Sequence, residues 1–294
     1  MKIYLAQNAG FCFGVERALR IAYETVKNSK IPIYTLGPLI HNPQVVEQLR
    51  TKGIIPLETL DNIKKGILII RSHGISPSIV EHAKEKGFTI VDATCPFVKQ
   101  AQEKAKMLKQ KGYQVVILGE REHPEVEGIL GFAGKDAVCI NNHTDIKNMS
   151  LSNKIGVVAQ TTQSMEMLSL VVSELIKITL EVRVFNTICT STQQRQKAAL
   201  KLAREVGCMI IVGGKNSANT KRLAALVKEK KTSTYHIETE KELKKNWFSG
   251  VGKAGVTGGA STPDWMIQRV IDEIKKLTEA KFVCKGTEVR QKLI

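Results

Sequence analysis

Apolar residues along this chain follow two patterns that alternate from the N-terminus onward. Residues 14–26 (GVERALRIAYETV) carry apolar side chains at helical spacing, and residues 31–37 (IPIYTLG) form a short apolar run that ends in glycine. The first pattern predicts an amphipathic helix and the second a buried strand. Because strands that alternate with helices need crossover connections, the chain is expected to form parallel sheets.

The order of cysteine, helix, strand and second helix occurs three times along the chain. It begins at Cys12, Cys95 and Cys189, and the glycine that ends the strand follows after 25, 24 and 24 residues. Each repeat continues with a further strand and a polar turn, namely RSHGISP, AQTTQS or GGASTP. Serine, threonine and proline in these turns predict the start of another helix. In the first two repeats a closing strand then leads to the next cysteine.

The third repeat has no closing strand of its own, and the N-terminal segment KIYLAQNAGFC can supply one. We therefore predict an α/β protein of three small domains with parallel sheets, related by a pseudo-threefold repeat around a central metal site. The predicted domains are residues 13–95, residues 96–189, and residues 190–281 together with 1–12, with residues 282–294 as a C-terminal tail.

Composition and charge narrow the class of protein. The chain has 294 residues, 43% of them hydrophobic, and a net charge of +16. This charge favours an anionic small substrate or an acidic protein partner. No basic segment is interleaved with aromatic residues, so no nucleic-acid partner is expected. No apolar run reaches about 18 residues and the N-terminus does not resemble a signal peptide, so we expect a cytoplasmic protein without membrane association.

The three repeated cysteines are candidates for metal ligation. Ligands of open α/β sheets bind at the carboxyl ends of the strands, where these residues are predicted to lie. Three thiolates suit a zinc ion with one open position, or a [4Fe–4S] cluster with one iron open to substrate. The alternative is that each is a small buried side chain. We expect that alternative for Cys139, Cys208 and Cys284, which do not share the repeated position.

Hydrogen-bond donors gather at the predicted strand ends in all three repeats. Imidazole, hydroxyl and amide groups, together with the N-termini of the following helices, suit an oxyanion or a phosphate. A single histidine can instead cap or pack a helix, and we expect such roles for His82, His143 and His236. The candidate anion-binding residues are His41, His73, His123, Ser217, Asn219 and Ser261.

Glu125 and Thr161 are candidates for proton transfer. Glu125 lies two residues after His123, and a carboxyl group beside a centre of low dielectric constant can have a raised pKa and act as an acid. Thr161, in the turn AQTTQS, can relay a proton or bind a substrate hydroxyl. Either residue can instead serve only to start a helix, where the helix dipole favours the glutamate.

The quoted motifs resemble the 4-hydroxy-3-methylbut-2-enyl diphosphate reductase (LytB/IspH) family. The resemblance runs in order over about residues 1–280 and rests on AGFCFGVERA, HNPQVVEQL, RSHGISP, DATCP, EHPEVEG, QTT, NTIC, NSANTKRL and GGASTPDW. It implies an iron–sulfur oxidoreductase of the last step of the non-mevalonate isoprenoid pathway. Such an enzyme reduces (E)-4-hydroxy-3-methylbut-2-enyl diphosphate, with two electrons and loss of water, to isopentenyl and dimethylallyl diphosphate.

The resemblance also implies roles for individual residues. It implies that Cys12, Cys95 and Cys189 hold a [4Fe–4S] cluster, with one iron open to the substrate hydroxyl. The proton-relay glutamate of the family matches Glu125, and its active-site threonine matches Thr161. A ferredoxin or flavodoxin is the implied electron donor. The implied diphosphate contacts are His41, His73, His123, Ser217, Asn219 and Ser261.

One position departs from the family pattern. Many members have a second serine where this chain has Ala218, so one side-chain hydroxyl toward the diphosphate is missing here. We expect a modest loss of affinity, because a neutral hydrogen bond contributes about 0.5–1.5 kcal/mol.

Two other classes of protein use the same features. A zinc or iron hydrolase acting on a phosphorylated substrate would use the three thiolates with water at the open position. A basic binding module that senses redox state or grips nucleic acid would need no proton donor at Glu125. Metal content distinguishes the first class, and the effect of Glu125→Gln on turnover distinguishes the second.

Overall fold

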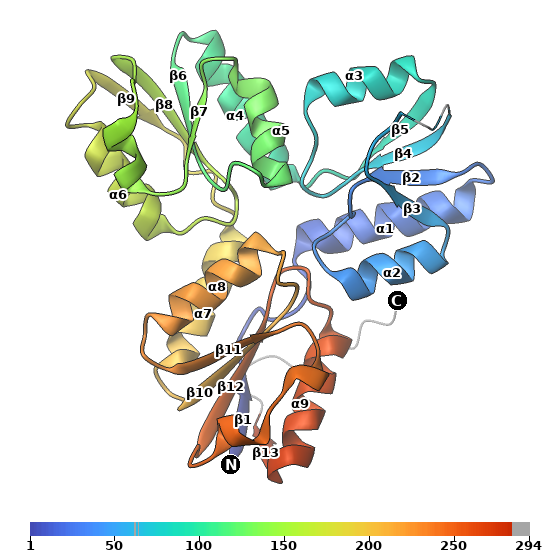
Figure 1. The fold of residues 1–294 in the computed structure, drawn as a ribbon, viewed down its shortest axis with the longest axis vertical. Coiled ribbons are helices and arrows are strands. Elements are labelled where there is room, and N and C mark those ends of the chain that lie inside the picture. Colours follow the sequence, from blue (N-terminus) through green and yellow to red (C-terminus); the bar gives the residue numbers. More distant parts are fainter. Residues whose placement is uncertain (62, 64, 284–294) are drawn as a thin grey trace. The chain divides into compact units, whose positions relative to one another are not determined.

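The fold consists of parallel sheets with helices packed on them. The computed structural model of the protein describes residues 1–61, 63 and 65–283, and these form three separate sheets (Figure 1). Every strand pair in the three sheets is parallel. The predicted α/β class with three parallel-sheet units is confirmed.

The chain divides into two compact units. The middle unit contains Gly14–Ile40 and Gln44–Cys189, and the terminal unit contains Met1–Phe13, His41–Pro43 and the residues from Thr190 onward. Two of the sheets lie in the middle unit, so a boundary at residue 95 stays a prediction.

The first sheet of the middle unit has the strand order β3-β2-β4-β5. Helix α3 packs on one face, where Ala83 joins Leu68 and Phe88 of the strands in one buried cluster. The strands are β2 (Ile33–Leu36), β3 (Ile54–Leu57), β4 (Gly66–Ile70) and β5 (Phe88–Asp92), and the helices are α1 (Phe13–Asn28), α2 (Pro43–Thr51) and α3 (Pro77–Glu85).

The second sheet has the order β7-β6-β8-β9, which repeats the connectivity of the first. Helices α4 and α5 cover one face of this sheet, and helix α6 covers the other. The strands are β6 (Gln114–Leu118), β7 (Val138–Ile140), β8 (Lys154–Ala159) and β9 (Glu181–Val184), and the helices are α4 (Pro96–Gln110), α5 (Pro124–Ala133), η1 (His143–Asn148) and α6 (Met165–Leu175).

The sheet of the terminal unit has the order β11-β10-β12-β1-β13. Strand β1 lies beside β12, with Ile3 opposite Ala254, so the N-terminus completes the third repeat as predicted. The strands are β1 (Lys2–Leu5), β10 (Cys208–Val212), β11 (Ser233–Ile237), β12 (Lys253–Gly258) and β13 (Lys281–Val283), and the helices are α7 (Thr190–Ala203), α8 (Ala218–Lys228), η2 (Glu240–Glu242), η3 (Lys245–Phe248) and α9 (Asp264–Thr278).

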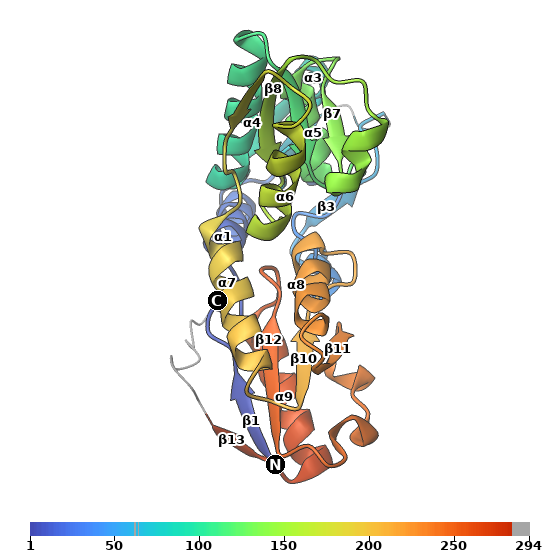
Figure 2. The same cartoon turned by 90° about the vertical axis from the view of Figure 1, so that its left-hand side faces the viewer.

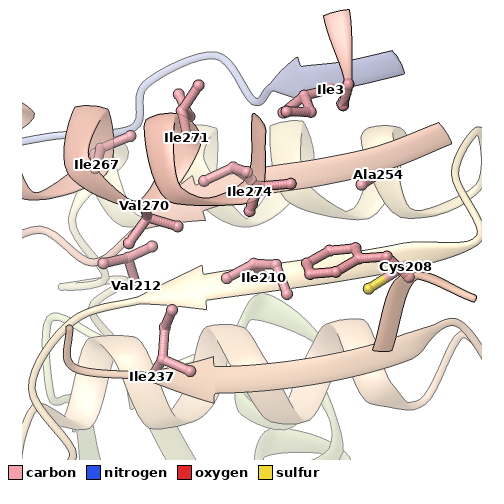
Figure 3. Close-up of a cluster of buried hydrophobic side chains, with 13 residues drawn as sticks. Ile3, Cys208, Ile210, Val212, Ile237, Ala254, Ile267, Val270, Ile271 and Ile274 are labelled. Atoms are coloured by element: carbon pink, nitrogen blue, oxygen red, sulfur yellow. The ribbon is translucent and has the colours of Figure 1, made fainter. Parts of the chain in front are cut away.

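Apolar side chains fill both faces of the terminal sheet. Helix α9 presents Ile267, Val270 and Ile274 to strands β10 and β12, and this layer is drawn in Figure 3. Helices α7 and α8 lie on the opposite face (Figure 2). Their buried residues there include Leu202 and Leu223. These apolar faces follow the helical spacing, which is why the sequence pattern located the helices.

Four short strands were not predicted from the pattern. β3, β7 and β11 are edge strands that follow the second helix of each repeat. Their residues are only partly buried, and β3 contains Pro56, which is tolerated at a sheet edge. β13 pairs with β1 over Lys281–Val283, so the first residues of the predicted tail belong to the sheet. The rest of that tail, with Cys284, lies outside the described residues.

Close packing at a strand glycine gives a first prediction. Gly156 lies in β8, and a Cβ atom there would meet three side-chain atoms of Leu108 at 2.6–2.9 Å, although Leu108 is fully buried. We expect Gly156→Ala to destabilise the fold by about 1–3 kcal/mol through overpacking. Thermal denaturation should show a midpoint several degrees lower. Gly252→Ala is the control, because no atom lies within 4 Å of its added Cβ, and equal midpoints for the two variants would contradict the packing argument.

Candidate active site

The three repeated cysteines occupy equivalent places in their repeats. Each follows the last strand of its repeat, and its backbone N–H donates a hydrogen bond to a carbonyl two residues past the neighbouring central strand. The equivalence arises because each cysteine follows a strand that lies beside the same central strand of its sheet, although in the terminal sheet that strand is the N-terminal β1 and a fifth strand, β13, is added. The three bonds, each 3.0 Å long, are Cys12 N to Ala260 O, Cys95 N to Ser72 O and Cys189 N to Thr161 O.

The other described cysteines have a different character. Burial raises the pKa of Cys139 to about 11 and that of Cys208 to about 12, so both remain thiols at neutral pH. The Cys139 thiol donates to the Gly119 carbonyl at 3.2 Å, and Cys208 packs in the core of the terminal unit. These side chains therefore act as small core residues. Among the described cysteines there is no disulfide.

The repeated cysteines carry thiol groups that could ligate an iron–sulfur cluster or a zinc ion. Thiolates are the usual ligands of such clusters, and the loops after strand ends are where α/β proteins bind ligands. Cys95 and Cys189 belong to the middle unit, whereas Cys12 belongs to the terminal unit. Within either unit, the described residues form no group of three His, Cys, Asp or Glu side chains that could hold a metal ion.

A buried carboxyl group lies at the carboxyl edge of the second sheet. Glu125 is in the first turn of α5 and is 2% exposed. Its carboxylate accepts hydrogen bonds from the backbone N–H of Thr161, at 2.6 Å, and from the Thr161 hydroxyl, at 2.9 Å. Burial raises the pKa of Glu125 to about 7, although both bonds from Thr161 oppose the shift. A glutamic acid with this pKa can donate a proton at neutral pH.

Thr161 connects this acid to a cysteine loop. Its carbonyl accepts the N–H of Cys189, while its N–H and hydroxyl both donate to Glu125. The structure therefore brings Glu125, Thr161 and the backbone of Cys189 together, although Glu125 and Thr161 are 36 positions apart in the chain. Thr161 is therefore hydrogen-bonded both to the buried carboxyl group of Glu125 and to the backbone of Cys189.

The raised pKa of Glu125 predicts a pH dependence of stability. A raised folded-state pKa means that the stabilising contribution is complete below the ordinary value of 4.5 and is lost as the pH rises through about 7. The loss is on the order of 3 kcal/mol. Urea unfolding of the metal-free protein should show stability falling more between pH 5 and pH 8 than in Glu125→Gln. The same pH dependence in both proteins would mean that Glu125 has an ordinary pKa.

Two histidines lie together near this acid. His123 is the N-cap of α5, and its Nδ1 accepts the backbone N–H of Glu125 at 3.1 Å. The proton of the neutral ring is therefore on Nε2. The His73 and His123 rings meet edge to face, with centroids 5.5 Å apart. His73 follows β4 and His123 follows β6, so the ends of two different sheets contribute to this pair.

The terminal unit gathers the remaining candidate residues around the N-terminus of α8. Ser217 is the N-cap of α8, and its hydroxyl accepts the N–H of Thr220 at 3.3 Å. Ser261 donates to the backbone carbonyl of His41 at 2.9 Å, so these residues from distant parts of the chain are in contact. Asn219 is 6% exposed, and its side-chain Nδ2 has no hydrogen-bond partner among the described residues.

An unsatisfied buried donor beside a helix N-terminus suits an anion. Buried polar groups are normally paired, and a helix N-terminus attracts negative charge. Ala218 is the first residue of α8 and is 2% exposed, so its methyl group lies at this helix N-terminus. The three other histidines are placed differently: His82 is exposed on α3, His143 begins η1, and His236 lies in β11 with Nε2 2.8 Å from the Gly213 carbonyl oxygen.

The pattern analysis missed one buried charge. Arg195 lies in α7 and is 2% exposed, and its guanidinium donates to two backbone carbonyls. Its spacing gives a signal, because Thr192, Ala199 and Leu202 on the same face are also buried. An arginine on the buried face of a predicted helix is a candidate for a structural or positioning role.

These features define an α/β enzyme with cysteines and a buried acid at the carboxyl ends of its strands. The profile of the family described as LytB protein matches residues 3–275, and the chain belongs to this family.

Curated relatives are similar to the chain over nearly its whole length. A 4-hydroxy-3-methylbut-2-enyl diphosphate reductase of Pelobacter propionicus is 49% identical and is covered over 99% of its length by 95% of this chain. The protein of the same name from Aquifex aeolicus is 46% identical, with 96% of this chain and 98% of the relative covered.

Solved structures are similar as well. One is described as (E)-4-hydroxy-3-methyl-but-2-enyl diphosphate reductase, the terminal enzyme of the non-mevalonate pathway. It is 46% identical with a TM-score of 0.68, over 94% of this chain and 99% of that one. The E-1-hydroxy-2-methyl-but-2-enyl-4-diphosphate reductase from Plasmodium falciparum is 29% identical with a TM-score of 0.91, over 99% and 95%. In the part of the chain that the structure describes, no helix has the length and apolar character of a membrane span.

Proposed function

We propose that this protein reduces (E)-4-hydroxy-3-methylbut-2-enyl diphosphate to isopentenyl and dimethylallyl diphosphate, the last step of the non-mevalonate pathway. The reaction takes up two electrons and two protons and releases the substrate hydroxyl as water. The observation that carries the proposal is the arrangement at Thr161, which holds a buried acid of pKa about 7 and the backbone of Cys189. The names and near-complete coverage of the relatives support the same reaction.

Cys12, Cys95 and Cys189 are the proposed ligands of a [4Fe–4S] cluster in which one iron has no protein ligand. When bound, such a cluster supplies the electrons and a Lewis-acid position for the substrate hydroxyl. Equivalent backbone bonds at the three cysteines support the assignment, as does the position of Cys208 in the core of the terminal unit and of Cys139 against a core of the middle unit.

The diphosphate is the part of the substrate that the protein is proposed to bind through hydrogen bonds. The proposed contacts are imidazole, hydroxyl and amide groups at strand ends, together with the N-terminus of α8. Binding energy from this remote group positions the reacting carbon. The buried Nδ2 of Asn219, which has no hydrogen-bond partner among the described residues, supports anion binding at the N-terminus of α8. The proposed contacts are His41, His73, His123, Ser217, Asn219 and Ser261.

Glu125 is the proposed proton donor, and Thr161 is proposed to bind the substrate hydroxyl. The hydroxyl of Thr161 lies 2.9 Å from the Glu125 carboxylate, so a proton can pass between them by a single hydrogen bond. Burial raises the pKa of the carboxyl group to about 7, so a large share of it carries a proton at neutral pH, and burial also excludes bulk water from it.

An acidic one-electron carrier, a ferredoxin or flavodoxin, is the proposed reductant in the cytoplasm. The net charge of +16 favours association with such a partner. The association rate should fall as ionic strength rises, because salt screens the attraction. A rate that does not depend on salt would count against this partner.

Anaerobic purification followed by iron, sulfide and zinc analysis and a reductase assay tests the proposal. The expected result is a brown protein with about four irons per chain that a reductant bleaches and that consumes the diphosphate. Zinc in place of iron would instead indicate a metal-dependent hydrolase that acts on a phosphorylated substrate. A loaded protein that binds the diphosphate without converting it would overturn the proposed reaction.

A further inference from the structure

Two arginines hold the backbone that leads into two of the cysteines. Arg195 lies six residues after Cys189, in α7 of the terminal unit, and is almost wholly buried. Its two terminal nitrogens donate to the Gly258 carbonyl at 2.8 Å and to the Gly10 carbonyl at 2.9 Å. Gly258 ends β12, and Gly10 lies two residues before Cys12. One guanidinium thus ties the Cys12 loop to the adjacent strand.

The Cys12 loop has little freedom around this contact. Gly10 has φ +101°, a conformation that favours glycine, and a Cβ atom there would collide with the Asp264 carboxylate. The N–H of Cys12 is bonded to the Ala260 carbonyl. The loop is therefore held at Gly10 and at the N–H of Cys12, and Arg195 supplies the charged contact.

A second arginine makes the corresponding contact in the middle unit. Arg17 lies five residues after Cys12, in α1, and is half-buried. Its guanidinium donates to the Thr94 carbonyl at 3.1 Å, and Thr94 directly precedes Cys95. The two contacts are alike. In each, an arginine on the helix that follows one repeated cysteine donates to a backbone carbonyl just before another, Cys95 for Arg17 and Cys12 for Arg195.

The loop before Cys189 is held differently. Thr187, two residues before Cys189, exchanges hydrogen bonds with Ala159 at the end of β8: its hydroxyl donates to the carbonyl at 2.6 Å and accepts the N–H at 2.8 Å. The helix of this repeat contributes Lys104 over the Phe185 ring, 4.9 Å from its centroid. Cys189 therefore provides an internal reference, because the backbone that leads into it is held through Thr187.

Arginine suits this task for a physical reason. Its planar fork reaches two carbonyls at fixed angles, whereas a lysine ammonium offers a single point of contact. A hydrogen bond from a charged donor is stronger than a neutral one.

We propose that Arg195 and Arg17 are positioning residues that hold the loops of Cys12 and Cys95 in the ligating conformation before any cluster is bound. The proposal rests on the ligand role of these cysteines under the proposed function. It states that each arginine acts on one cysteine and leaves the other two unchanged.

Thiol alkylation of the metal-free protein, followed by mass spectrometry of each cysteine peptide, tests this proposal. We expect Arg195→Met to raise the alkylation rate of Cys12 by about twofold or more, because the loop that limits access to this partly exposed thiol is no longer held. Cys95 and Cys189 should keep the wild-type rate. Arg17→Met should raise the rate of Cys95 alone. Arg195→Lys, which keeps the charge and can make one of the two bonds, should give Cys12 an intermediate rate.

Matched controls come from exposed cations on the same helices. Lys197→Met in α7 and Arg20→Met in α1 should leave all three rates unchanged, since both side chains face solvent. If Arg195→Met unfolds, all cysteines will react alike, and Arg195→Lys and Arg17→Met then decide the question. Unchanged rates at Cys12 and Cys95, or equal increases at all three cysteines in folded variants, would overturn the proposal. Failure of the proposed function would instead appear as wild-type protein that takes up no iron.

Discussion

Glu125→Gln is expected to abolish most of the turnover while the diphosphate still binds. Glutamine has nearly the same shape and can keep one bond with Thr161, but it cannot donate a proton to the substrate. Loss of a positioned proton donor lowers the rate by about 10²–10⁴-fold. Single-turnover assays with loaded enzyme measure kcat, and calorimetry with the diphosphate measures binding.

The control for this variant is Glu122→Gln, which removes an exposed carboxylate from the turn just before α5. Its turnover should match the wild type. Because the pKa of Glu125 is about 7, kcat of the wild type should also decline as the pH rises above that value. Normal turnover in Glu125→Gln would exclude Glu125 as the proton donor and favour a binding role for the protein.

Cys95→Ser is expected to lose the iron–sulfur cluster, whereas Cys139→Ser should retain it. Cys95 lies at the N-terminus of α4 in the position shared by the three repeats. Cys139 donates its thiol to the Gly119 carbonyl, and burial raises its pKa to about 11, which disfavours a thiolate ligand. Both variants replace one cysteine sulfur by oxygen, so a difference in cluster content reflects the position of the cysteine in the fold.

Iron and sulfide content and the visible spectrum after anaerobic reconstitution measure the difference. Cys139→Ser should contain the same iron as the wild type, and Cys95→Ser less than about a quarter of it, since incomplete thiolate sets hold clusters poorly. Equal iron content in the two variants would contradict the three-ligand assignment.

The spacing of apolar residues along the chain predicts those helices and strands that make extensive buried contacts. The helices and central strands follow the spacing of their apolar residues, and β1 was placed in the last sheet because the third repeat lacked a closing strand. The edge strands β3, β7 and β11 carry mixed and partly exposed residues, so the pattern gave no signal for them. Their pairing depends on the strands already formed beside them.

The sequence by itself determined the three repeats, the α/β class and the residue types at the strand ends, because periodicity and spacing are local properties of the chain. Tertiary structure decided how those residues act. The pKa of Glu125 follows from burial and from contact with Thr161, 36 positions away. The contact between Arg195 and Gly10 spans 185 positions. Such contacts depend on how helices and sheets pack, and no local pattern encodes which distant backbone a side chain will meet.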